Sequence, residues 1–114
     1  MLQFICCWKI IYYDEKVEKD LLDLPDTLLA RYLRLSELMM NYGPNIGMPH
    51  TKALRQGLFE LRLNGKEGIA RVFFCAFAKK NICMLHCMIK KTNEIPLQDL
   101  RLARSRLKEV ENDS

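Results

Sequence analysis

The pattern of apolar and polar positions divides the first half of the chain into one strand and two helices. The segment FICCWKIIYY, residues 4–13, is rich in β-branched and aromatic side chains and predicts a strand. Residues 14–24 place apolar side chains at near-helical spacing, with acidic residues in the first turn, where they complement the helix dipole. Residues 26–43 carry an apolar stripe that Gly43 and Pro44 end. We expect a helical hairpin that packs on a sheet.

The second half predicts three strands and a closing helix. A loop over residues 45–52 comes first. The strand-like segments that follow are residues 57–63, 68–77 and 81–90. Asn64-Gly65 signals a hairpin between the first two of them, and apolar positions three and four apart indicate a helix over residues 96–112. The prediction for residues 1–114 is one α+β domain, in the order strand, helix, helix, three strands, helix, whose helices cover a twisted antiparallel sheet.

Length and composition narrow the class of protein. A chain of 114 residues buries about two-thirds of the surface that it exposes when unfolded, so it needs no metal or disulfide to fold. The apolar opening contains Lys9 and has no small-residue cleavage site, which favours a strand over a signal peptide. Because no run of about 20 apolar residues occurs, we predict no membrane span. We expect a soluble, cytoplasmic protein.

Five cysteines raise the alternative of a metal site or a disulfide framework. They are Cys6, Cys7, Cys75, Cys83 and Cys87. Their number is odd and they lie in apolar, strand-like segments, as small buried side chains do in a reducing compartment. Cys83 and Cys87 lie on a predicted strand with no further ligand pair at zinc-finger spacing. We therefore predict no metal site and no cofactor.

Charge is distributed unevenly along the chain, whose net charge is +4. Residues 1–50 carry five lysine and arginine residues against seven acidic residues, a balance of −2. Residues 51–114 carry thirteen against seven, a balance of +6. A polyanion would therefore bind the second half, although solvated lysines also produce such an excess.

Side-chain alternation along the predicted strands places several of these charges. Glu60 and Arg62 project from the less apolar face of their strand. Arg71 is the only charged residue of an apolar strand, so it needs a carboxylate partner, water or a polyanionic ligand. On the last strand, parity assigns Lys90 to the face of His86.

A sheet face that gathers Lys52, Arg62, Arg71 and Lys90 would suit a phosphodiester backbone. Arginine binds phosphate oxygens in a bidentate fork, and lysine supplies a point charge. Such cations would also stabilise the negative charge that develops during RNA cleavage. Two simpler interpretations stay open at this point. Glu60 and Arg62 could belong to a set of cross-strand salt bridges on a solvated face, and His86 could be a core histidine whose hydrogen bonds are satisfied within the fold.

The succession KAL, GLFELR, RVFF and LHCMIKK resembles the phage-related HigB-like branch of the RelE/ParE toxin superfamily. The resemblance runs from Trp8 to about Glu109, and LFELR and the KK after the LH-bearing strand are its most specific parts. It implies a toxin of a type II toxin–antitoxin module, with helices packed on a twisted antiparallel sheet. Members of the HigB and RelE type are ribosome-dependent endoribonucleases that cleave mRNA without a metal.

The resemblance also implies roles for individual residues and partners. The expected catalytic residues are Arg62, Arg71 and Lys90. The residues expected to hold mRNA and rRNA phosphates are Lys52, Arg55, His86 and Lys91. The implied partners are the ribosome with its mRNA and a HigA-like antitoxin of the helix-turn-helix type, with no membrane and no small-molecule cofactor. Two alternatives remain, namely a ParE-like toxin that inhibits DNA gyrase without cleaving RNA, and an inactive phage-derived binding module.

Overall fold

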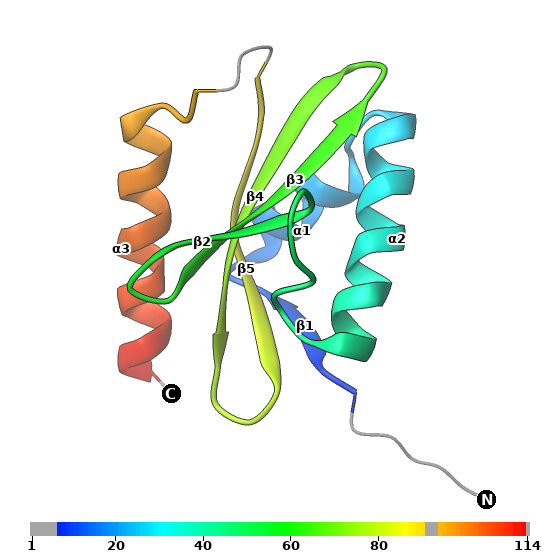
Figure 1. Cartoon of the computed structure of the whole chain (residues 1–114). Coiled ribbons are helices and arrows are strands. Elements are labelled where there is room, and N and C mark those ends of the chain that lie inside the picture. Colours follow the sequence, from blue (N-terminus) through cyan, green and yellow to red (C-terminus); the bar gives the residue numbers. More distant parts are fainter. Residues whose placement is uncertain (1–6, 91–93, 114) are drawn as a thin grey trace, which may run out of the picture.

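A single five-stranded sheet lies between helices in the computed structural model, which describes residues 7–90 and 94–113 (Figure 1). The elements are β1 (Lys9–Tyr12), α1 (Glu15–Leu22), α2 (Asp26–Tyr42), β2 (Thr51–Arg55), β3 (Leu58–Gly65), β4 (Gly68–Phe77), β5 (Asn81–Lys90) and α3 (Leu97–Asp113). The strand order across the sheet is β1-β5-β4-β3-β2. The predicted α+β class is confirmed. None of the described helices has the length and apolar character needed to cross a membrane.

The sheet differs from the prediction at its two edges. β2 lies at the end of the predicted loop and pairs antiparallel with β3, so the chain has one strand more than predicted. At the other edge, β1 pairs parallel with β5, from Lys9 opposite Asn81 to Tyr12 opposite Met84. The sheet is therefore mixed, and the prediction that it is wholly antiparallel is wrong. The connection from β1 to β5 contains both helices and three strands, and a parallel pair needs a long connection of this kind.

The two faces of the sheet bury unequal amounts of apolar surface. α1 and α2 pack on one face, where the helices and the turn between them contribute Val17, Leu21, Leu24, Leu28, Tyr32, Leu35 and Met39 to the core. α3 packs on the other face, on the opposite side of the sheet from α2 (Figure 1). Its fully buried residues are Ala103 and Leu107. Because this second layer is thinner, the sheet face under α3 can carry polar side chains.

The helix ends follow from local chemistry. Asp14 caps α1, because its Oδ1 accepts a hydrogen bond of 2.9 Å from the backbone N–H of Val17. Gly43 ends α2 with a φ of 104°, a conformation that favours glycine, and its N–H donates to the carbonyl of Met39. The predicted bounds of both helices are confirmed to within two residues.

The cysteine thiols of β4 and β5 should lower the stability of the fold when the pH becomes alkaline. Burial raises the pKa of Cys75 and Cys87 to about 12 and that of Cys83 to about 11, from an ordinary value of 9.0. Unfolded thiols ionise above pH 9, whereas the folded ones stay protonated. The free energy of unfolding should therefore fall between pH 9 and 11, by up to about 1.4 kcal/mol per pH unit for each thiol.

Urea titrations across that pH range measure this dependence. Cys75 and Cys83 lie opposite each other on β4 and β5, so a C75A/C83A variant removes two of the three thiols at one place. Its slope against pH should be shallower than that of the wild type by about two thiol contributions. Equal slopes in the two proteins would show that these thiols do not titrate with unfolding.

Candidate functional site

The strand register places the predicted cations of β2, β3 and β4 on one face of the sheet. Lys52 lies opposite Glu60, and Arg62 lies opposite Arg71. Directly opposite residues project from the same face, as do residues two apart on one strand. Arg71 is two residues from Phe73, which belongs to the core under α3. These side chains therefore share the face on which α3 packs, as the hypothesis of one cationic sheet face required.

β5 extends the same face at its far end. His86 lies opposite Phe73, and Lys90 lies opposite Ile69, two residues from Arg71. The backbone position of Lys90 thus shares the face of His86, which confirms the assignment by parity. The side chain of Lys90 and the whole of Lys91 lie outside the described residues, so their predicted roles stay predictions.

Arg71 is buried in an ion pair with Glu60. Its Nη1 contacts Oε2 of Glu60, and the two side chains are 0% and 3% exposed. A buried guanidinium is tolerated where a carboxylate compensates its charge, and Glu60 on the neighbouring strand provides that carboxylate. The sequence predicted a carboxylate, water or a polyanionic ligand as the partner of Arg71, and the structure provides the carboxylate of Glu60. Arg71 is therefore out of reach of solvent, contrary to the hypothesis that it offers its charge to a phosphodiester backbone on this face.

Lys52 and Arg62 are the cations of this face that solvent reaches. Lys52 is exposed and Arg62 is half-buried. With Glu60, they line a small pocket that the loop at residues 48–51 closes. Glu60 forms its ion pair with Arg71 on the neighbouring strand, so the alternative of a cross-strand salt bridge is correct for Glu60. Within residues 7–90 and 94–113, neither Lys52 nor Arg62 makes an ion pair, and both charges are available to an anion.

Arg55 lies at the end of β2, away from this pocket. A bulge between Ala53 and Arg55 shifts the register, and Arg55 has a φ of 128°. Its side chain is exposed, and its carbonyl oxygen accepts a hydrogen bond of 3.2 Å from Nη1 of Arg104. The structure thus brings Arg55 next to α3 rather than next to Lys52.

His86 connects β5 to the first turn of α3. Its Nε2 lies 2.7 Å from Oδ1 of Asp99, and its ring stacks on Phe73 with 6.1 Å between ring centroids. The His86 and Asp99 side chains are only 18% and 22% exposed. This arrangement matches the interpretation of His86 as a satisfied histidine of the fold, while the predicted phosphate contact stays untested.

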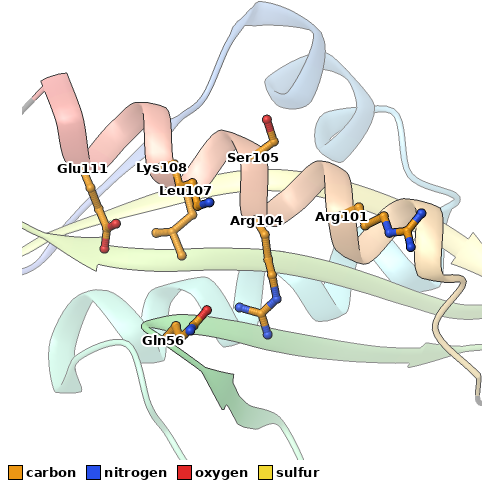
Figure 2. Close-up of a pocket in the computed structure, with 7 residues that line it drawn as sticks. All are labelled: Gln56, Arg101, Arg104, Ser105, Leu107, Lys108 and Glu111. Carbon is orange, nitrogen blue, oxygen red and sulfur yellow. The ribbon is translucent and has the colours of Figure 1, made fainter.

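A second group of cations lies on α3 and was not among the predicted site residues. Arg101, Arg104 and Lys108 line a groove of about 530 Å³ between α3 and the β2–β3 turn. The other lining residues are Gln56, Ser105, Leu107 and Glu111. Figure 2 shows Arg104 extending from α3 toward the strand next to Gln56. Positions 101, 104 and 108 are three and four apart, so helical spacing already puts them on one stripe.

Arg106 has a different surrounding from these three cations. Its Nη1 donates a 2.7 Å hydrogen bond to the carbonyl of Leu85, and its guanidinium lies 4.6 Å from the ring centroid of Tyr13. Arg106 therefore fastens α3 to the sheet, whereas Arg101 and Lys108 are exposed. Among the basic residues of α3, Arg106 thus attaches the helix to the sheet, whereas Arg101, Arg104 and Lys108 form a stripe that lines the groove.

Comparison with known proteins supplies a family for this fold and site. The family model described as Phage derived protein Gp49-like (DUF891) matches residues 19–108, which include α2, the strands β2 to β5 and most of α3. No curated protein matches the sequence. The matched range covers most of the chain and contains Lys52, Arg62 and the α3 stripe. The chain therefore belongs to the Gp49-like family of phage-derived proteins (DUF891), a family associated with toxin–antitoxin modules of the RelE-like kind.

Proposed function

We propose that this protein is the toxin of a type II toxin–antitoxin module and that it inhibits translation by cleaving mRNA on the ribosome. Membership of the Gp49-like family and the HigB-like sequence resemblance support this proposal. The observation that carries it is the accessible pair Lys52 and Arg62, on the sheet face where parity also assigns Lys90. Two cations that make no ion pair within the described residues are suited to phosphate oxygens.

The chemistry requires charge stabilisation at one phosphate. The 2′-oxygen of the RNA attacks the adjacent phosphorus, its proton passes to a base, and the 5′-oxygen leaves with a proton. The products carry a 2′,3′-cyclic phosphate and a 5′-hydroxyl. Lys52 and Arg62 would hold the negative charge that grows on the phosphate oxygens in the transition state. Lys90 is the proposed residue next to the scissile group.

The proposal includes partners and a location. The RNA is mRNA in the decoding site of the ribosome, which places the protein in the cytoplasm. The neutralising partner is an antitoxin of the helix-turn-helix type. Because the cleavage uses the hydroxyl of the RNA itself, the reaction needs no metal and no cofactor.

Pulse labelling after controlled expression in a bacterial host tests this function. We expect incorporation of labelled amino acids to fall first, with mRNA fragments appearing at the same time, while thymidine incorporation continues. An early loss of thymidine incorporation with intact mRNA would instead identify a ParE-like inhibitor of gyrase. Continued growth with both syntheses intact would identify an inactive binding module.

A further inference from the structure

We infer that the groove between α3 and the β2–β3 turn binds the sugar–phosphate backbone of single-stranded RNA. The inference rests on the proposed function and extends it, because it assigns a second contact region for the same RNA. The residues that carry it are Arg101, Arg104 and Lys108, which line the groove from one stripe of α3. Three cations along one groove indicate an elongated polyanion rather than a single small anion.

The spacing of the cations fits a nucleotide chain. A helix rises about 1.5 Å per residue, so Arg101 and Lys108 lie roughly 10 Å apart along the axis of α3. A strand that keeps the helical rise of about 3.4 Å per nucleotide passes about three phosphates over that length. Arg104 lies between the two ends of the stripe. Its donor contact with the carbonyl of Arg55 fixes the guanidinium across the groove.

The walls of the groove favour one strand over a duplex. The β2–β3 turn faces α3 across a volume of about 530 Å³, which suits one or two nucleotides at a time. The buried Leu107 forms an apolar floor, and Gln56 and Ser105 add uncharged hydrogen-bonding groups. Such groups suit ribose hydroxyls, whereas a duplex would present its phosphates on a surface too wide to enter.

Glu111 sets the end of the proposed RNA path. It lines the groove one turn beyond Lys108 and adds a negative charge at that end. The bound strand would therefore lie over the part of α3 from Arg101 to Lys108 and leave the groove before its C-terminal end. The N-terminal end of α3 adjoins His86 through Asp99, so this path leads from the groove toward the sheet face.

The test measures binding of a short single-stranded 2′-O-methyl oligonucleotide by fluorescence anisotropy at several salt concentrations. The variant is R101Q/K108Q, because both side chains are exposed and Arg104 has a structural hydrogen bond. We expect about tenfold weaker binding or more. The slope of log affinity against log salt should fall by about 1.4, at about 0.7 per lost phosphate contact.

The matched control is R31Q/R34Q, which removes two exposed arginines from α2 on the opposite face of the sheet. This variant should bind like the wild type, because its net charge changes equally but its groove does not. E111Q should bind more tightly than the wild type. A hairpin duplex of the same length should bind the wild type less tightly than the single strand does.

Several outcomes would overturn the inference. The first is an equal loss of RNA affinity in R101Q/K108Q and in R31Q/R34Q. The second is tighter binding of the duplex than of the single strand. The third is displacement of the bound RNA by an acidic peptide at a lower concentration than unlabelled RNA requires. The proposed function fails separately, if the wild type leaves translation intact. If the wild type arrests translation but R101Q/K108Q binds RNA as tightly as the wild type, the groove is not an RNA-binding site and the proposed function still stands.

Discussion

Replacing Glu60 with glutamine should destabilise the fold by about 3–5 kcal/mol, because the buried Arg71 then loses the negative charge of the carboxylate that it contacts. Arg71 is fully buried, and Glu60 is the carboxylate that it contacts. At about 4–8 °C for each kcal/mol, the midpoint of thermal unfolding should fall by roughly 12–40 °C. Differential scanning calorimetry and urea titration measure the change.

Two further variants show whether the loss of stability comes from burial of the Glu60–Arg71 pair. E60L/R71M removes both charges and keeps side chains of similar bulk, so it should fold with a stability near that of the wild type or above it. D20N breaks the exposed pair between Lys16 and Asp20 on α1 and should change stability by less than about 1 kcal/mol. A Glu60 variant as stable as the wild type would contradict the importance of the pair.

The E60L/R71M variant also tests the role of the Glu60–Arg71 pair in catalysis. Because this variant should remain folded, any loss of mRNA cleavage would reflect the missing pair and not the missing fold. We expect cleavage to persist, since solvent does not reach Arg71. A folded but inactive double variant would restore Arg71 to the predicted catalytic group.

Replacing Lys52 and Arg62 with alanine should have the largest effect on activity. A hydrogen bond from a charged group contributes about 1.5–3 kcal/mol, so the loss of both contacts should slow mRNA cleavage on programmed ribosomes by roughly 10²- to 10⁴-fold. Single-turnover cleavage of end-labelled mRNA measures the rate. The unfolding temperature should change little, because neither side chain makes an ion pair within the described part of the chain.

Lys66 and Lys79 provide the control for this variant. Both are exposed in hairpin turns, and K66A/K79A changes the net charge by the same amount as K52A/R62A. The control should cleave at the wild-type rate. Equal rates in all three proteins would exclude Lys52 and Arg62 from the site.

The fold follows from local pattern wherever an element is long and periodic. Both halves of the helical hairpin, the strands β3 to β5 and α3 have the predicted types, because their apolar positions repeat over eight residues or more. β2 escaped prediction because it has five residues, mostly exposed, and its pairing with β3 is made by the backbone. The parallel pairing of β1 depends on contacts far apart in sequence, which periodicity does not encode.

Side-chain alternation predicted on which face of the sheet a residue lies, but not how deeply it is buried. Parity correctly assigned Glu60 and Arg62 to one face of β3, and the position of Lys90 to the face of His86. It did not indicate that Arg71 is buried, because burial depends on the central position of β4 and on Glu60 from the adjacent strand. The α3 groove requires the docking of a helix on the β2–β3 turn, which only the three-dimensional structure shows.

Sequencing of 5′-hydroxyl RNA ends in cells that express the protein tests the central claim most directly. The claim is that the accessible cations of the sheet face cleave mRNA through its own 2′-hydroxyl. It predicts new 5′-hydroxyl ends inside translated reading frames with the wild type and with K66A/K79A, and a loss of those ends with K52A/R62A. Growth arrest by the wild type without such ends, or equal numbers of ends with K52A/R62A, would contradict it.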